Sequence, residues 1–320
     1  MGTERSQIGM SRESDMESGD EVRSHLNRLH AAVWELAAIA LALRDPTTTD
    51  PEQRHAAQQV LIETGLLLAS ERGIDLSPGL IEAAGGDSSR LAAQAAAGIL
   101  QSAAVLSGAN AWTSQDDEAI LAQGRASAQA AQAFKAFAVP MMDGLDELLS
   151  GSCPIMLDVG VGVGAMAVAY CESFPNLKVV GIDVFPRALE LARRLIDQAS
   201  MANRIEVREQ DVAKLEDRET FCLAWLPAPF VPRAAIETGL ERMVAALVPG
   251  GWLMVGHGKF GEGGLSDGLT RFQTVAFGGT AINGNEAQDL LRRCGLDHLA
   301  TLPTPAGTPG ITVGRRTVRS

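Results

Sequence analysis

Aromatic side chains, cysteine and positive charge are all scarce in this sequence. Phe, Trp and Tyr make up 4% of its 320 residues, and tyrosine occurs once. Its four cysteines, at positions 153, 171, 222 and 294, lack the spacing of metal ligands and do not cluster with the five histidines, so we expect no metal site. Because scattered cysteines of this kind are typical of a reducing compartment, we expect a cytoplasmic protein.

A basic excess and a long apolar segment are also missing. Lys and Arg number 27 against 39 Asp and Glu, which gives a net charge of -12. Binding to nucleic acid or to an anionic membrane surface needs a basic face, so we expect neither partner. The longest apolar stretch in the first half, residues 31–43, is too short to span a bilayer and contains Glu35. We also expect no signal peptide, since no basic segment with an apolar core and a cleavage site precedes it.

The chain divides into regions of different pattern. Residues 1–20 are polar and rich in Ser, Gly and charge, which predicts a disordered tail. Over residues 21–150 apolar residues recur at helical spacing and no strand pattern is found, so we expect an all-helical domain. One of its helices is expected to begin after Asp50 and to end at Gly73.

From residue 151 to residue 320, strand patterns alternate with helix patterns. The alternation predicts a parallel sheet covered by helices on both faces. No helix separates the last two strands, so the final strand is expected to run antiparallel as part of a hairpin. The seven expected strands are 155–159, 178–183, 204–211, 221–227, 251–258, 296–305 and 310–316.

A glycine-rich turn follows the first of these strands. Gly160, Gly162 and Gly164 lead into an apolar run that opens a helix. Such a turn brings backbone N–H groups and the positive end of a helix close to a ligand, because glycine lets the backbone approach closely. Read loosely, the pattern also fits the dinucleotide form G-x-G-x-x-G/A, and a tight turn without a ligand is a third interpretation.

Three acids stand at the ends of neighbouring strands. Asp158 precedes Gly160 by two residues, and Asp183 ends the next strand, 183 − 164 = 19 residues beyond the last glycine. A carboxylate in the second position reaches ribose hydroxyls in either cofactor class. Asp211 ends the third strand, where it could face an adenine edge. The alternative for each acid is a helix cap or a loop hydrogen bond.

These motifs, followed by Leu-Val-Pro-Gly-Gly at 247–251 and the closing hairpin, resemble the class I S-adenosylmethionine-dependent methyltransferases over residues 141–320. A dinucleotide fingerprint normally opens the first strand of a domain, whereas about 130 helical residues precede this one. The resemblance implies a Rossmann-like core, S-adenosylmethionine as the cofactor and S-adenosylhomocysteine as the product. There is one departure, because the strand before the acceptor site often begins with an acid and here carries Cys222.

The family pattern also implies roles for single residues. The three glycines would line the methionine part of the cofactor, and Asp158 would lie near its amino group and sulfonium. Asp183 would hold the ribose hydroxyls, while the adenine would be contacted by Val184, Phe185, Asp211 and Val212.

Methyl transfer depends mainly on positioning, and it needs a general base only when the nucleophile carries a proton of high pKa. His257 follows the fifth strand and is the candidate base, with a structural hydrogen bond as the alternative. Contacts to the acceptor are expected from the loops after the fourth and fifth strands, through Trp225, Pro227, Phe230, His257 and Phe260. An Asp/Asn-Pro-Pro-aromatic motif, which suits amide or amine nitrogens, is missing from the first of these loops.

Small-molecule methyltransferases of this type often carry an N-terminal helical domain that covers the acceptor and builds a dimer. By resemblance we expect residues 21–150 to do so in a homodimer, with residues 151–320 binding the cofactor. Gln123, Arg125 and Ser127 would touch the methionine carboxylate, or else be ordinary surface residues. The expected function is methylation of a small organic acceptor in specialised metabolism, at a hydroxyl first, then nitrogen, then carbon. The alternatives are cofactor binding without transfer and a scaffold whose helical half binds a partner.

Overall fold

The computed structural model describes residues 19–44, 47, 49–71, 73–84, 88–106, 117–128, 131, 134–261, 263–304 and 308–318. Contacts between Cα atoms divide the chain into two compact units, Met1–Ser88 and Ser89–Ser320. The domain limits expected from the sequence, with a boundary at 150/151, stay a prediction. Most of the expected disordered tail lies outside the described residues, and its last two residues, Gly19 and Asp20, already belong to the first helix.

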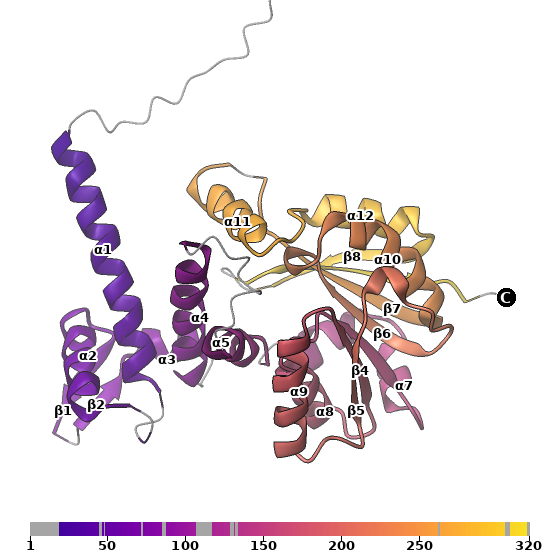
Figure 1. The fold of residues 1–320 in the computed structure, drawn as a ribbon, viewed down its shortest axis with the longest axis horizontal. Coiled ribbons are helices and arrows are strands. Elements are labelled where there is room, and N and C mark those ends of the chain that lie inside the picture. The colour runs from indigo at the N-terminus through magenta and orange to yellow at the C-terminus, as the bar shows by residue number, and fades with distance from the viewer. Residues whose placement is uncertain are drawn as a thin grey trace, which may run out of the picture. The chain divides into compact units, whose positions relative to one another are not determined.

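The first unit is helical with one small hairpin (Figure 1). A carboxylate oxygen of Asp50 accepts a hydrogen bond from the Gln53 N–H and caps the second helix, as its start signal predicts. The elements are α1 (Gly19–Ala42), α2 (Pro51–Glu63), β1 (Leu67–Ser70), β2 (Gly73–Leu76) and α3 (Pro78–Ala84).

The expectation that residues 21–150 contain no strand is wrong in this region. β1 and β2 pair antiparallel, from Leu67 opposite Leu76 to Ser70 opposite Gly73. The helix expected to reach Gly73 ends at Glu63, because Gly65 takes a left-handed conformation with φ 73°. A left-handed glycine just beyond a helix ends it by redirecting the chain.

The second unit begins with helices that precede the sheet. They are α4 (Ser88–Leu106), α5 (Asp117–Ala128), a π-helical turn η2 (Phe134–Ala138), a 3-10 turn η3 (Val139–Met141) and α7 (Leu145–Ser150). α4 buries five alanines, whose small side chains allow close packing. α7 ends beside Gly151, as its sequence predicts.

A seven-stranded sheet forms the core of the second unit, in the order β5-β4-β3-β6-β7-β9-β8. The first five strands in this order pair in parallel, and β9 is antiparallel to both β7 and β8. All seven predicted strands are present, and the predicted fold class is confirmed. Their bounds are β3 (Ile155–Val159), β4 (Lys178–Asp183), β5 (Ile205–Glu209), β6 (Phe221–Pro227), β7 (Leu247–His257), β8 (Leu296–Leu302) and β9 (Gly310–Arg316).

Helices cover both faces of the sheet (Figure 1). On one face, α7, α8 (Ala165–Ser173) and α9 (Pro186–Gln198) pack on a buried cluster that includes Met156 and Tyr170. On the other face, α10 (Arg233–Ala246) and α12 (Gly284–Arg293) pack on a cluster that includes Leu157 and Leu240. The remaining elements follow strand ends: η4 (Val212–Lys214), η5 (Ala228–Phe230) and α11 (Leu265–Ala276). Within the described ranges, none of the helices has the length and hydropathy needed to cross a bilayer.

Candidate functional site

The glycine loop joins β3 to α8 in a backbone conformation that favours glycine. Gly160, Gly162 and Gly164 have φ angles of 68°, 55° and 75°, in the left-handed region where other residues are strained. The N–H groups of Gly160 and Val161 both donate to the Ile182 carbonyl, at 2.8 and 3.1 Å. The loop is therefore anchored to the end of β4, and it feeds directly into the N-terminus of α8, as a ligand-binding turn requires.

Asp183, at the end of β4, is joined to the same loop by its side chain. One carboxylate oxygen accepts from the Gly162 N–H and the other from the Phe185 N–H, each at 2.9 Å. Burial raises the pKa of Asp183, while these backbone hydrogen bonds act in the opposite direction. A carboxylate has about four acceptor positions, so its oxygens retain capacity for ribose hydroxyls. The ribose role stays a prediction, alongside the loop hydrogen bonds that the structure contains.

Asp158 lies beneath the glycine loop and is the least satisfied polar group of the site. Its side chain is 1% exposed, and neither carboxylate oxygen has a hydrogen-bond partner among the described residues. Burial, and then the nearby Asp183, raise the pKa of Asp158 to about 8. An unpartnered buried carboxylate is costly and favours a cationic ligand. S-adenosylmethionine, with its ammonium and sulfonium charges, is chemically suited to this position.

The residues predicted to contact adenine lie on two loops. Asp211 caps η4 by accepting from the Ala213 N–H at 2.9 Å, so the capping alternative for this acid is realised. Val212 is buried and packs against α10, where a side-chain carbon on Gly239 would lie 2.9 Å from it. Val184 is 67% exposed, and Phe185 packs beside a small cluster around Ile120. Their contacts to adenine stay predictions.

Two predicted acceptor residues lie at the carboxyl end of β6, beside the glycine loop. A side-chain carbon on Gly160 would lie 3.5 Å from Pro227 Cγ, which places β6 next to the loop. The ring of Trp225 covers Gly256 of β7 so closely that a side chain there would overlap with it. Pro227 therefore gives the loop an apolar neighbour, and Trp225 packs across β6 and β7.

The other two aromatic candidates lie farther along, against α11. The rings of Phe230 and Phe277 have centroids 5.3 Å apart. Phe260 is 8% exposed and its ring lies 4.2 Å from the Arg271 guanidinium carbon. Their predicted acceptor contacts are not tested by this arrangement, which shows only that α11 and the loops before it pack together.

His257 is buried at the end of β7, with 3% of its surface exposed. Its Nδ1 lies 2.9 Å from the Gly258 carbonyl oxygen and its Nε2 3.0 Å from the Thr312 hydroxyl. A carbonyl oxygen only accepts, so Nδ1 carries the hydrogen and Nε2 accepts from Thr312. Burial lowers the pKa of His257. This is the geometry of the structural alternative, and the base role stays an untested prediction that would require one contact to break.

The predicted methionine-carboxylate residues of α5 already have partners. Gln123 donates to the Ser127 hydroxyl at 3.1 Å and accepts from Gln101 of α4 at 2.5 Å. Arg125 pairs with Glu118 at 2.9 Å.

Two other residues of α5 were not predicted from the sequence to belong to the site. Gly124 touches the glycine loop, and a lone glycine inside a helix pattern is the signal that points to it. Asp117 pairs with Arg187, 70 residues away, for which the sequence has no signal.

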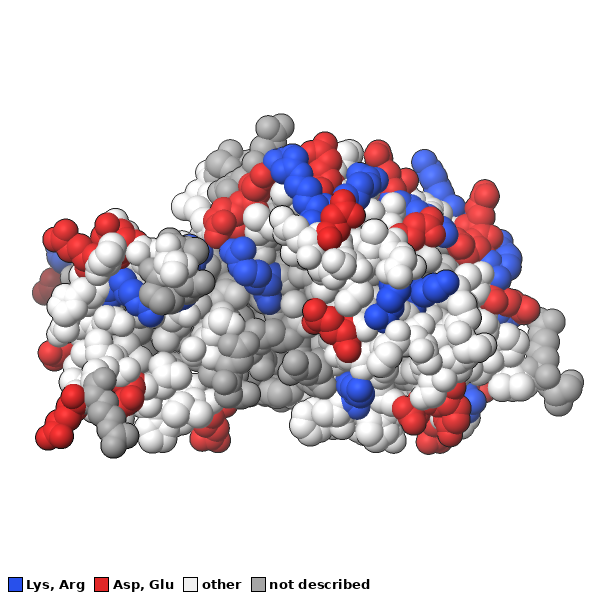
Figure 2. All heavy atoms as spheres, turned by 90° about the horizontal axis from the view of Figure 1, so that it is seen from below, with Lys and Arg blue, Asp and Glu red and all other residues white. Residues whose placement is uncertain are grey.

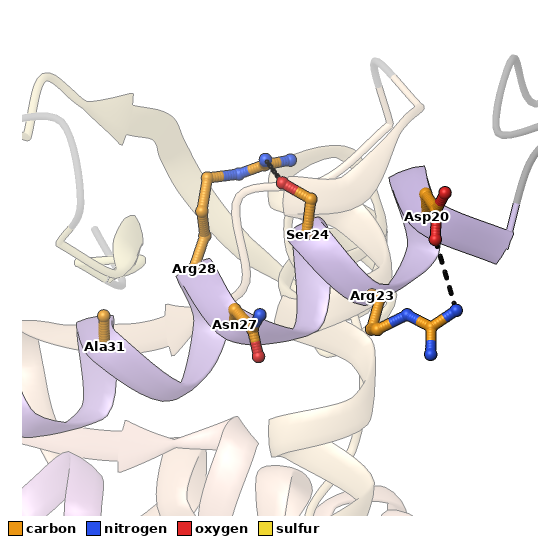
Figure 3. Close-up of a pocket in the computed structure, with 6 residues that line it drawn as sticks. All are labelled: Asp20, Arg23, Ser24, Asn27, Arg28 and Ala31. Atoms are coloured by element: carbon orange, nitrogen blue, oxygen red, sulfur yellow. Dashed lines mark hydrogen bonds and ion pairs between the residues drawn. The ribbon is translucent and has the colours of Figure 1, made fainter.

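A hollow on the surface of the first unit is unrelated to these residues. It is lined by one exposed helix, α1, through Asp20, Arg23, Ser24, Asn27, Arg28 and Ala31 (Figure 3). In it Arg23 pairs with Asp20 at 3.2 Å and Arg28 donates to Ser24 at 2.9 Å. The hollow contains none of the predicted site residues, and we assign it no function.

Charged side chains of both signs share the surface of the protein. On the face in Figure 2, Lys and Arg side chains lie among Asp and Glu instead of gathering in one cluster. In the part of the chain that the structure describes, there is no group of three or more His, Cys, Asp or Glu residues that could hold a metal ion.

The chain is similar to known methyltransferases. Residues 156–251 match the family model described as a methyltransferase domain. The release factor glutamine methyltransferase of Rhodopirellula baltica is 29% identical over 104 residues, which cover 32% of this chain and 35% of that protein. The chain spans between a third and a half of the first curated relatives that it matches.

Solved structures match over nearly the whole chain. Human N-acetylserotonin methyltransferase, in complex with SAM, has a TM-score of 0.61 at 16% identity and covers 94% of this chain and 99% of its own. The mitomycin 7-O-methyltransferase MmcR has a TM-score of 0.54 at 18% identity, with 93% and 98% covered. Identities this low show the fold. Together with the family match, they confirm the predicted resemblance, the enzyme class and the cofactor at the level of this domain.

Proposed function

We propose that this chain, which carries a class I S-adenosylmethionine-dependent methyltransferase domain, transfers a methyl group from that cofactor to a hydroxyl of a small organic acceptor. The observation that carries the proposal is the unpartnered carboxylate of Asp158, buried beneath the glycine loop at the carboxyl end of the sheet. In an open α/β sheet this end is where ligands bind. A cationic cofactor would supply the positively charged partner that the carboxylate of Asp158 lacks.

The residues around the glycine loop have different roles in binding the cofactor and the acceptor. The glycines hold the loop open to the ligand, and Asp183 fixes the loop while offering its remaining acceptor positions to the ribose. When bound, S-adenosylmethionine supplies a methyl group on a positively charged sulfur. Pro227 provides apolar surface beside the loop and Trp225 provides it at β7, and both help to exclude water and to orient an acceptor.

The class of acceptor is supported by whole-chain similarity. The two solved structures named above cover over nine tenths of this chain, and one is called a 7-O-methyltransferase of mitomycin. The curated relative matches only about a third of the chain. A small molecule in specialised metabolism is therefore our first choice. The second candidate is an amide nitrogen, because that relative is called a glutamine methyltransferase.

The helical unit is proposed to join two copies of the chain. Five large apolar side chains of α1 form what we call the α1 stripe, and each is 38% to 57% exposed: Val22, Leu26, Leu29, Val33 and Leu36. Their spacing alternates between four and three residues, which is the repeat that packs one helix against another. A second copy presents the same stripe, so the two faces would cover each other. We further propose a cytoplasmic location, in keeping with four unpaired cysteines.

Calorimetry and product analysis test the proposal. We expect the purified chain to bind S-adenosylmethionine and to form S-adenosylhomocysteine when small phenols or alcohols are added. Binding without product from any acceptor would support a cofactor-binding protein that transfers no methyl group. No heat at millimolar cofactor would support a scaffold instead.

A further inference from the structure

One helix outside the matched methyltransferase domain touches the glycine loop directly. Gly124 lies in the middle of α5 and faces Val163, which stands between two of the loop glycines. A side-chain carbon on Gly124 would overlap with Val163 Cγ2 and would lie 3.5 Å from Ala165 Cβ. The backbone of α5 therefore rests on a loop side chain, an approach that only glycine permits.

The same face of α5 makes a further contact one turn earlier. Ile120, which is 3% exposed, packs in a cluster with Val163, Ala188 and Leu191. Residues four apart lie on one side of a helix, so Ile120 and Gly124 present one continuous face. A glycine inside a helix costs about 1 kcal/mol relative to alanine. The close approach to Val163 gives a physical reason for tolerating that cost.

An ion pair ties the start of α5 to the other side of the site. The Arg187 guanidinium donates from Nε and Nη2 to the two carboxylate oxygens of Asp117, at 2.8 and 2.5 Å. Two parallel hydrogen bonds of this kind fix orientation as well as distance. Arg187 lies in the first turn of α9, just after Asp183. α5 is thus held both at the glycine loop and at the turn that follows the ribose acid.

We infer that α5 is a clamp on the cofactor loop, in which Gly124 and Asp117 are positioning residues that hold Val163, and with it the left-handed backbone of Gly162 and Gly164, in the shape that receives S-adenosylmethionine. This inference rests on the proposed function. It assigns part of the cofactor site to a helix that lies before residues 156–251. Cofactor affinity should then depend on the fit between α5 and Val163.

A pair of compensating substitutions tests the clamp. In the full chain, Gly124→Ala should weaken S-adenosylmethionine binding at least tenfold by calorimetry, because its new methyl group displaces α5 from the loop. Adding Val163→Ala removes the overlapping methyl groups and leaves the two side-chain carbons 3.6 Å apart, an ordinary contact. The double variant should therefore bind within about threefold of the native chain. If Gly124→Ala acted only by raising helix propensity, it would stabilise α5 and would not weaken S-adenosylmethionine binding.

A matched control and a second route keep the test decisive. Gly98→Ala changes a glycine of α4 whose added carbon meets nothing within 4 Å, and it should leave affinity unchanged. If Gly124→Ala does not fold, as judged by circular dichroism, then Asp117→Asn should weaken binding at least threefold. Native affinity in Gly124→Ala or Asp117→Asn, or a folded double variant without rescue, would overturn the clamp. Failure of the native chain to bind the cofactor would instead refute the proposed function.

Discussion

The carboxylate of Asp183 accepts a hydrogen bond from the Gly162 N–H at 2.9 Å, although the two residues are 21 positions apart. The acid at the end of β4 thereby holds the loop that follows β3. The same carboxylate also accepts from Phe185. Asp183 thus has two tasks, since it shapes the glycine loop before any cofactor is present and is proposed to bind the ribose afterwards.

Replacing this acid should weaken cofactor binding. Asp183→Ala removes both loop hydrogen bonds and the proposed ribose contact, and we expect a loss of about 1.5–3 kcal/mol, the usual value for a hydrogen bond to a charged group. Calorimetry with S-adenosylmethionine measures the change, with Asp289→Ala, an exposed acid paired with Arg292 on α12, as the control. Unchanged affinity in Asp183→Ala would remove this residue from the ribose.

The raised pKa of Asp158 predicts how stability depends on pH. Its folded pKa is about 8 and its ordinary value is 3.8, so between these values the folded chain keeps a proton that the unfolded chain releases. Stability of the cofactor-free protein should therefore fall as pH rises through this window, by up to about 1.4 kcal/mol per pH unit, and level off above it. Asp158→Asn, which cannot ionise, should lose less stability between pH 5 and pH 8. Urea unfolding at several pH values measures this, and equal slopes in both proteins would contradict it.

Asp158 also predicts that a proton is released when S-adenosylmethionine binds. Among the described residues, Asp183 and Tyr170 lie close enough to Asp158 for their ionisation to be coupled with its own, and neither supplies a cation. A cationic ligand should therefore drive the proton off Asp158. Binding heats measured at pH 7 in phosphate and in Tris should differ for the native chain and agree for Asp158→Asn, because these buffers take up protons with different enthalpies. Identical heats for the native chain would show that Asp158 keeps its protonation state.

His257 gives a prediction that separates stability from catalysis. His257→Ala removes a buried ring that contacts Gly258 and Thr312, and we expect a loss of about 1–3 kcal/mol in the free energy of unfolding. A base role adds a second effect, because protonation of His257 in acid would stop it from accepting a proton and activity would fall. Since burial lowers the pKa of His257 from its ordinary value of 6.5, this fall should begin below pH 6.5. Measuring the rate at several pH values shows whether the native chain loses activity in acid and whether this loss disappears in His257→Ala. A fully active His257→Ala rules the base role out.

The α1 stripe predicts a dimer that charge can break. Leu29→Glu with Val33→Glu places carboxylates in the middle of the stripe, where they could not be buried against a second copy. Light scattering after gel filtration should give the mass of two chains for the native protein and of one for the variant. Asn27→Glu, an exposed polar position on the same helix, should stay dimeric. A native protein that elutes as a monomer would end this proposal.

The fold of the second unit follows from local patterns, and its contacts do not. Residues such as Ile155–Val159 are mostly apolar and are bounded by glycine or proline, and the glycines after them mark the loop, so strands and loop were predictable. The hairpin β1–β2 was not, because Leu66 to Ala69 continue the apolar spacing of α2 and only the left-handed Gly65 ends that helix. The pairing of Asp117 with Arg187 joins distant positions that no local pattern connects. The engaged nitrogens of His257 likewise depend on Thr312, which is 55 residues away.

The most direct test of the account is the fate of the methyl group. The native chain would be incubated with S-adenosylmethionine labelled at the methyl carbon and with a panel of small phenols, alcohols and amines, and the products would be separated by mass spectrometry. We predict label in at least one hydroxyl acceptor together with an equal amount of S-adenosylhomocysteine, and loss of both in Asp183→Ala at low cofactor concentration. Tight binding of the cofactor with no labelled acceptor and no S-adenosylhomocysteine would contradict the proposed transfer.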